Sequence, residues 1–162
     1  MMNGTIRIAM AVLLLAATAG CNSNSADPRV AADGFTLYSI DAGREPGDGS
    51  SADGDAPKFH GWIVLGKVGI DDRAERSRLI TALQEGIDNN NGSPAKCFNP
   101  RHALRIVDGD STTDYLICFE CYQIQVFKAR NELAPTSVKL TAKEPEKVFN
   151  DALRKAKLPL SQ

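Results

Sequence analysis

The first 20 residues constrain the fold most, because their pattern is that of an export signal that is removed from the folded body. Arg7 precedes an apolar run over residues 8–19, and small side chains fill residues 17–20. A helix over this run would be about 18 Å long, well short of a hydrocarbon layer of roughly 30 Å. The length and the flanking residues favour an export signal over a membrane span or a buried helix. We therefore expect residues 1–20 to be removed, leaving a body of 142 residues.

The tetrapeptide Thr-Ala-Gly-Cys that ends at Cys21 resembles the lipobox of bacterial lipoproteins. In that family the cysteine receives diacylglycerol before cleavage and becomes the mature N-terminus. The resemblance implies that Cys21 carries acyl chains, including palmitate-type chains, which hold a soluble domain at a membrane. Thr18 stands where the family prefers Leu, so ordinary cleavage after Ala19 remains open. Asn22 in place of Asp implies sorting to the outer membrane, facing the periplasm or the cell surface.

Composition limits the size and the partners of the exported body. It carries 18 basic and 20 acidic side chains, a net charge of −2. This near balance, together with export, argues against a nucleic-acid partner, which usually requires a strongly basic face. After a long polar loop is set aside, about a hundred residues remain, enough for one small domain and one core.

The polar stretches divide the chain into a tether, a domain and one long loop. Residues 21–34 lack apolar periodicity, and we expect a flexible, lipidated tether there. The single domain is expected over residues 35–162. Within it, residues 41–58 are rich in Gly, Asp, Ser and Pro, which predicts a disordered surface loop.

Hydrophobic periodicity predicts an α+β domain with an antiparallel sheet of about five strands and two helices. One helix is expected after a cap at Asp71 or Asp72 and ends near Asn89, and the second starts at Pro145. The predicted order is ββαβββα, in which grouped strands favour an antiparallel sheet with both helices on one face. The expected strands cover residues 35–40, 59–70, 103–107, 113–127 and 137–140.

A tight turn over residues 108–111 predicts the register of the cysteine-bearing strands. If the turn centres on Gly109 and Asp110, opposed residues have numbers that sum to about 219. Cys97 then lies opposite Cys121 or its neighbour, whereas Cys118 points to the other face. The simplest expectation is a disulfide between Cys97 and Cys121, with Cys118 as a free, buried thiol.

Other uses of the same residues remain open at this point. Cys97, His102, Cys118 and Cys121 together form a ligand set that zinc favours, although the Cys-x2-Cys pair lies in a β-rich run. A thiol-dependent reaction at these cysteines, including Cys118 as a nucleophile served by His102, is a further alternative. The simpler interpretation is that His102 and Arg101 bond to backbone or carboxylate groups, with Glu120 or Asp114 as partners within reach.

The body resembles a family of uncharacterised bacterial exported proteins, in the strings FHGWIVLGKV, CFNPRHALR and ICFECYQIQVF. The resemblance implies no activity, no catalytic residue and no cofactor. Tyr38, Phe59 and Trp62 are expected to be core aromatics. The sequence thus predicts a lipid-anchored envelope domain that binds a partner or has a structural role, in preference to an enzyme. The alternative is a small metal-binding or thiol-dependent protein.

Overall fold

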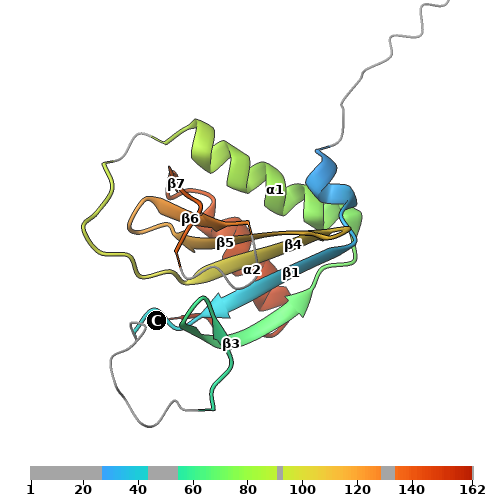
Figure 1. Cartoon of the computed structure of the whole chain (residues 1–162), viewed down its shortest axis with the longest axis horizontal. Coiled ribbons are helices and arrows are strands. Elements are labelled where there is room, and N and C mark those ends of the chain that lie inside the picture. Colours follow the sequence, from blue (N-terminus) through green and yellow to red (C-terminus); the bar gives the residue numbers. More distant parts are fainter. Residues whose placement is uncertain (1–26, 44–54, 91–92, 129–133, 162) are drawn as a thin grey trace, which may run out of the picture.

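Runs of β-branched and aromatic residues form antiparallel strands, and two amphipathic segments form α-helices (Figure 1). The computed structural model describes residues 27–43, 55–90, 93–128 and 134–161. Its elements, in chain order, are η1 (Pro28–Ala31), β1 (Gly34–Ile40), β2 (Lys58–Phe59), β3 (Trp62–Gly69), α1 (Arg73–Asp88), β4 (His102–Asp108), β5 (Ser111–Cys118), β6 (Gln123–Phe127), β7 (Ser137–Leu140) and α2 (Glu146–Lys155).

The strands form one curled sheet in the order β2-β3-β1-β4-β5-β6-β7, and every neighbouring pair is antiparallel. The β4–β5 hairpin has the register expected from its turn. Asp108 pairs with Ser111 and His102 pairs with Ile117, so opposed residue numbers sum to 219. Gly109 adopts a positive φ of 53° in this turn, a conformation that glycine adopts at little cost.

The α+β class with an antiparallel sheet and two helices is confirmed, but the expectation of five strands was too low. Two of the expected strands are interrupted by turns. His60 and Gly61, with φ of 48° and 87°, separate β2 from β3. Tyr122, with φ of 56°, lies in the turn that separates β5 from β6. Because most non-glycine residues rarely adopt positive φ, hydrophobic periodicity did not predict these two turns.

The helices begin and end close to their expected limits. Asp72, one of the two expected caps, accepts a hydrogen bond from the Ala74 N–H at 3.0 Å. Asn89 follows the last helical residue of α1. Pro145 takes the cap position of α2, one residue before the helix, and the helix ends at Lys155.

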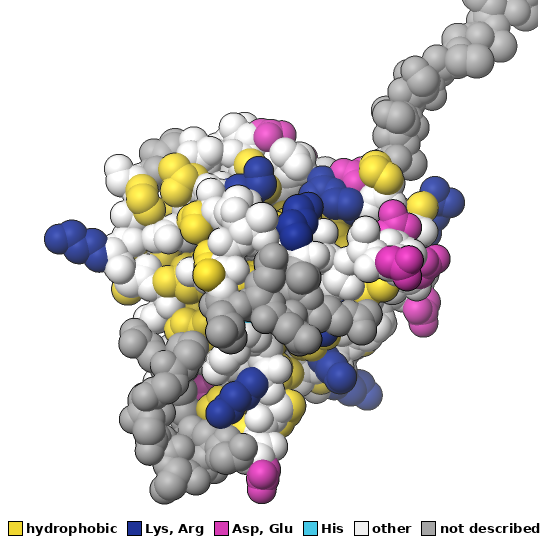
Figure 2. Space-filling model, in the orientation of Figure 1, with side chains coloured by type: hydrophobic (Ala, Val, Ile, Leu, Met, Phe, Trp, Pro, Cys, Tyr) yellow, Lys and Arg dark blue, Asp and Glu magenta, His cyan; other side chains and the backbone are white. Residues whose placement is uncertain are grey.

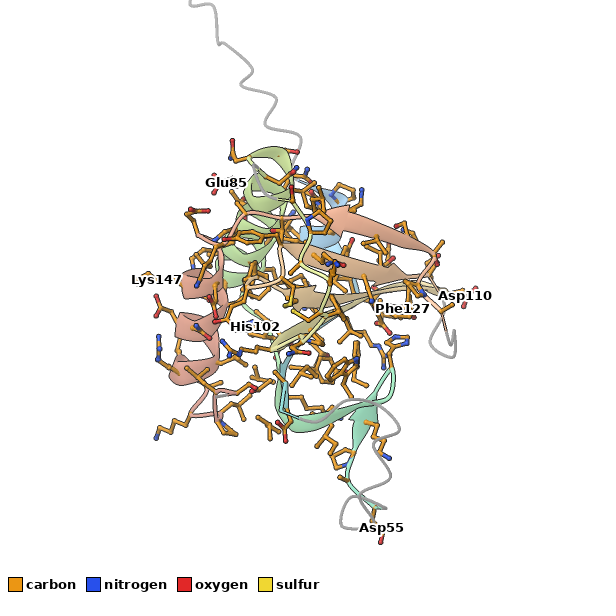
Figure 3. The ribbon with its side chains drawn as sticks, turned by 90° about the vertical axis from the view of Figure 1, so that its left-hand side faces the viewer. Asp55, Glu85, His102, Asp110, Phe127 and Lys147 are labelled. Atoms are coloured by element: carbon orange, nitrogen blue, oxygen red, sulfur yellow. A yellow bond between two sulfur atoms is a disulfide. The ribbon has the colours of Figure 1, made fainter. Side chains whose placement is uncertain are left out.

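Both helices pack on one face of the sheet, as the side view shows (Figure 3). Leu79 and Leu83 of α1 and Phe149 and Leu153 of α2 are fully buried in that core. The β2–β3 hairpin covers part of the opposite face and closes a second apolar cluster there. This cluster contains the three expected core aromatics and consists of Tyr38, Ile40, Phe59, Trp62, Ala103, Leu116 and Phe127.

Part of the expected tether, before residue 35, packs against the domain. Val30 and Ala32 are 5% and 3% exposed and belong to the helix-side core. The export segment, Cys21 and residues 44–54 of the expected loop lie outside the described residues. In the described part of the chain, neither helix is long and apolar enough to cross a membrane.

Candidate functional site

A buried carboxylate organises a charged cluster on the sheet face opposite the helices. Asp114 lies on β5 and its side chain is fully buried. The directly opposed residue on β4 is Arg105, whose Nε donates to Asp114 Oδ1 at 2.7 Å. His60 Nε2 approaches Asp114 Oδ2 at 2.7 Å from the tip of the β2–β3 hairpin. The cluster therefore joins the two strands of one hairpin to the tip of a second hairpin that is distant in the sequence.

Hydrogen bonds to Asp114 outweigh the cost of burying its charge. Burial by itself raises the pKa of the Asp114 carboxyl, but hydrogen bonds from Arg105 and His60 leave that pKa below its usual value. The bond to Asp114 in turn raises the pKa of the Arg105 guanidinium. Asp114 and Arg105 are both charged at neutral pH, and the carboxylate fixes the guanidinium in place.

Aromatic rings hold the other side of this cluster. The His60 ring stacks on Phe127 of β6, with centroids 3.7 Å apart, and Phe127 lies close to the hairpin tip (Figure 3). The rings of Phe59 and Tyr38 pack together with their centroids 4.5 Å apart. The Arg105 guanidinium lies 4.8 Å from the centre of the Phe59 ring. A cation over an aromatic face is attracted by the ring quadrupole. The arrangement keeps Arg105 in one orientation.

A pocket of about 490 Å³ opens beside Arg105. Its lining combines basic groups with an apolar wall and consists of Tyr38, Pro57, Lys58, Phe59, His60, Val64, Leu65, Gly66, Lys67 and Arg105. None of these ten lining residues is acidic. Figure 2 views this face of the molecule, where Lys and Arg side chains occur above and below the centre and most Asp and Glu side chains lie toward one edge. The pocket thus presents positive charge beside aromatic and aliphatic surface.

The cysteines are arranged differently from the expected Cys97–Cys121 pair. Cys118 and Cys121 form the disulfide, and Cys97 is exposed with a free thiol. The reason is local: β5 ends at Cys118, and a turn brings the two Cα atoms to 5.1 Å, whereas a continued strand would point them to opposite faces. The Sγ atoms of Cys97 and Cys121 are 4.0 Å apart.

His102 lies apart from the cysteines, on the helix side of the sheet (Figure 3). Its Nε2 donates to Asn150 Oδ1 of α2 at 2.9 Å, and its ring contacts Phe119 and Phe149 edge-on. Burial lowers the pKa of His102 to about 4, so the ring is neutral at physiological pH. Its Nδ1 has no hydrogen-bond partner among the described residues.

The zinc and nucleophile hypotheses both require His102 to lie close to Cys118, but the two residues lie on opposite faces of the sheet. Cys118 follows Ile117, which faces the helices with His102, so strand alternation points Cys118 to the other face. Over the described ranges, no group of three or more His, Cys, Asp or Glu side chains is arranged to hold a metal ion. Arg101, another residue of the CFNPRH string, pairs with Glu120 at 2.8 Å.

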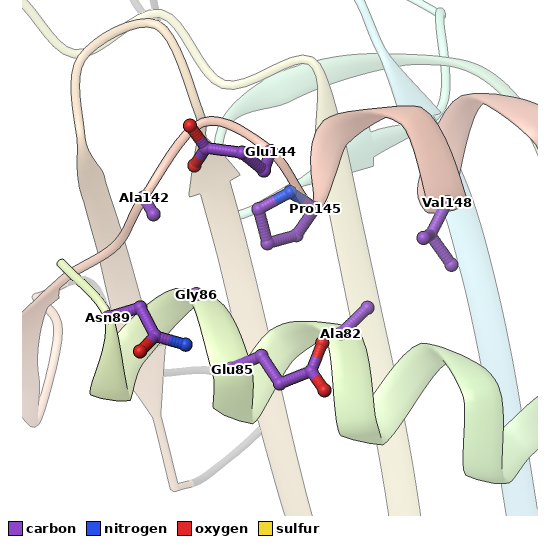
Figure 4. Close-up of a pocket in the computed structure, with 8 residues that line it drawn as sticks. All are labelled: Ala82, Glu85, Gly86, Asn89, Ala142, Glu144, Pro145 and Val148. Atoms are coloured by element: carbon purple, nitrogen blue, oxygen red, sulfur yellow. The ribbon is translucent and has the colours of Figure 1, made fainter.

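A second pocket, of about 400 Å³, lies between α1 and the segment that leads into α2 (Figure 4). Glu85 of α1 and Glu144 both line it, beside Pro145 and Val148. Gly86 forms part of its floor, where the chain before α2 approaches the helix closely. This pocket lacks the buried charged support that Asp114 gives to Arg105.

The sequence contained part of the signal for the Asp114 cluster. Arg105 and Asp114 have numbers that sum to 219, so the predicted hairpin register already places them opposite each other. An acidic residue inside a run of strand formers was the second indication. No such signal pointed to Lys58, His60 or Lys67. These residues belong to the β2–β3 hairpin, which reaches the site from a distant part of the sequence.

Comparison of the chain with family models, with curated proteins and with solved structures finds no match in any of the three.

Proposed function

We propose that this chain is a lipid-anchored envelope domain that binds a small anionic ligand in the pocket beside Arg105. One observation carries the binding part of the proposal: the pocket has three basic side chains and no acidic one in its lining. Its aromatic and aliphatic wall suits a ligand with an apolar portion, and a few fixed polar groups beside such a wall are typical of small-molecule sites.

The electrostatics favour an anion over a cation. Asp114 neutralises one positive charge from behind the pocket, which leaves the equivalent of two positive charges from Lys58, Lys67 and Arg105. Arg105 is 24% exposed and is already oriented by Asp114, so it loses little conformational freedom when a carboxylate or phosphate approaches. A preformed guanidinium of this kind suits such groups.

The anchoring part of the proposal is supported by the export pattern and by Cys21. Lipid at Cys21 would hold the body at a membrane, with the outer membrane, facing the periplasm or the cell surface, as the proposed location. Labelling cells with an alkyne fatty acid should mark the native protein and not its Cys21→Ser variant. Equal absence of label from both proteins would contradict the anchor.

Binding is tested with probes that carry the proposed chemistry, benzoate and inorganic phosphate, followed by chemical-shift changes in the protein's NMR spectrum. Exchanging both pocket lysines, in Lys58→Gln/Lys67→Gln, should weaken benzoate binding about tenfold, since two nearby charges contribute together roughly 1.4 kcal/mol. Added salt should weaken binding to the native protein as well. The matched control is Lys139→Gln/Lys143→Gln, which removes two exposed lysines that do not line the pocket.

Comparing the two double variants distinguishes binding in the pocket from a general effect of surface charge. Equal weakening in the two double variants, or no shift of pocket resonances with either probe, would contradict the binding proposal.

The second candidate function is a metal-binding or thiol-dependent protein that uses Cys97, His102, Cys118 and Cys121. Only its thiol part is favoured, by the closeness of three sulfur atoms.

A further inference from the structure

Three cysteine sulfurs lie together at the end of β5, and backbone hydrogen bonds hold the third beside the other two. The Ala95 N–H donates to the Cys121 carbonyl oxygen at 3.2 Å. The Asn99 N–H donates to Cys121 Sγ at 3.4 Å. Cys97 is midway between these two anchors, which explains why its Sγ lies 4.0 Å from Cys121 Sγ. Since two sulfurs at this distance are nearly in contact, a small shift brings them within bonding range.

The segment that carries Cys97 is irregular, so a shift of Cys97 breaks no strand pairing. Residues 93–101 contain no helix or strand, whereas Cys118 ends β5 and Cys121 lies in the following turn. Cys97 is exposed, but Cys118 and Cys121 are 2% and 3% exposed. Of the three sulfurs, the free thiol is therefore the one that solvent reaches most readily.

We propose that Cys97, Cys118 and Cys121 form a thiol–disulfide exchange site. The Cys97 thiol loses its proton to solvent, and the thiolate attacks Cys121 Sγ. A Cys97–Cys121 bond forms while the Cys118–Cys121 bond breaks, and Cys118 leaves with the electron pair and takes up a proton. One thiol and one disulfide are present before and after the step, so the exchange needs no external oxidant or reductant.

The surroundings of Cys118 favour its role as the leaving group. The Cys121 N–H donates to Cys118 Sγ at 3.1 Å, and a donor in this position stabilises the negative charge that develops on the sulfur. The exchange moves the free thiol from an exposed position at Cys97 to a buried one at Cys118. One isomer thus presents a thiol to other molecules and the second isomer hides it.

This site goes beyond anion binding and does not depend on it, because none of the three cysteines lines the Arg105 pocket. It also relates the two pairings of Cys121 to each other. The bond expected from the hairpin register and the bond present in the structure are isomers joined by one displacement.

The test identifies both bonds in the full chain. The protein is incubated at neutral pH and transferred to mildly acidic denaturant, where exchange is slow because little thiolate is present, and free thiols are blocked with a large excess of N-ethylmaleimide. Trypsin then releases residues 97–101 separately from residues 106–128, which carry both Cys118 and Cys121. We expect mass spectrometry to find two species: an internal disulfide with Cys97 blocked, and a cross-link between the two peptides with Cys118 blocked.

A second experiment distinguishes exchange from two disulfide forms that do not interconvert. It removes the isomer with a free Cys97 by alkylation and follows the cross-linked isomer. When iodoacetamide is added to the native protein, it should alkylate the exposed Cys97, and the cross-linked species should disappear as the isomers interconvert. Cys97→Ser should give only the internal disulfide, and Cys118→Ser should give only the cross-link. The proposal is overturned if the native chain contains no cross-link, if iodoacetamide leaves the cross-linked fraction unchanged, or if Cys118→Ser forms no Cys97–Cys121 bond.

Discussion

At the scale of single residues, Asp114 is the side chain on which the pocket depends. It is fully buried, and it forms hydrogen bonds with Arg105 on the neighbouring strand and with His60 at the tip of the β2–β3 hairpin. Removing one partner from a buried pair leaves an uncompensated charge, which costs far more than losing an exposed pair. The pocket's positive charge is therefore coupled to the stability of the sheet face beneath it.

The first prediction concerns Asp114→Asn, which keeps the shape but removes the charge. We expect a loss of about 3 kcal/mol in the free energy of unfolding at neutral pH, measured by urea denaturation. Because the folded pKa of Asp114 is lowered, its charge stabilises the protein above the unfolded value of 3.8, and this is lost as pH falls through the folded pKa. The variant should lack that part of the acid dependence.

Asp151→Asn is the matched control for this prediction. Asp151 also has a lowered pKa, through its bonds to Lys147 and Arg154, but it lies at the surface of α2. Exposed ion pairs contribute little, so this variant should unfold at nearly the native urea concentration. An equal effect of the two substitutions would show that Asp114 is not the organising charge.

The second prediction follows from His102, whose folded pKa is lowered by burial from 6.5 to about 4. Above pH 6.5 the ring is neutral in both states. As pH falls from 6.5 toward 4, the unfolded chain binds a proton that the folded protein excludes, so the protein should lose about 3 kcal/mol of stability over this window. Urea denaturation at a series of pH values measures the slope.

His102→Gln should flatten that slope, because glutamine does not titrate and still donates toward Asn150. The chain has two histidines, so His60→Gln is the natural control. If the acid sensitivity disappears with His60→Gln and persists in His102→Gln, the assignment to His102 is wrong.

At the scale of elements, periodicity predicted the sheet and the helices well because each run is long and bounded by strong turn residues. The five expected strands and the two helices lie within a few residues of their observed positions. Periodicity missed the breaks inside two runs, at His60 and Tyr122, where the backbone adopts a positive φ. The second break also explains the cysteines, since the turn at residues 119–122 allows Cys118 to reach Cys121.

The third prediction concerns Gly86, where α1 meets the chain that leads into α2. A Cβ at this position would lie 2.5 Å from Thr141 Oγ1 and 2.9 Å from Pro145 Cγ. Alanine is the better helix former by about 1 kcal/mol, but the clash with buried neighbours costs more, so Gly86→Ala should destabilise by about 1–3 kcal/mol. Thermal unfolding measures the change.

Thr81→Ala on the same helix is exposed and serves as the control. It should leave the melting temperature unchanged or raise it slightly, since propensity alone acts there. A higher melting temperature for Gly86→Ala than for the native protein would mean that the close approach of α1 to residues 141–145 is not tight.

At the scale of the whole molecule, the pocket exists because the β2–β3 hairpin lies over the sheet face that carries Arg105. The β4–β5 pairing of Arg105 with Asp114 follows from one local turn and was predictable. His60 and Phe59 arrive through the β2–β3 hairpin, and contacts across the sheet face decide where that hairpin lies. A pattern of residues along one chain segment holds no information on such a contact, so the candidate site could be predicted only in its β4–β5 half.

The last prediction concerns where the folded body begins. We compare a chain that starts at Asp27 with one that starts at Gly34, which keeps β1 whole but removes η1. The shorter chain loses the buried Val30 and Ala32, and with them the Ala32 carbonyl that accepts from Arg76 Nη1 at 2.6 Å. Burying a valine contributes about 1.5–3 kcal/mol, so we expect the shorter chain to be less stable by about 2–4 kcal/mol in urea.

A point variant separates the packing of η1 from the effect of chain length. Val30→Ala in the longer chain should reproduce part of the loss, about 1 kcal/mol, because it removes two buried methyl groups and leaves the backbone bonds in place. Equal urea midpoints for the two chains would mean that η1 does not belong to the cooperative unit, and the tether would then extend to residue 34, as the sequence alone predicts. An intermediate midpoint for Val30→Ala would instead place the start of the cooperative body at η1, seven residues after the proposed lipid site at Cys21.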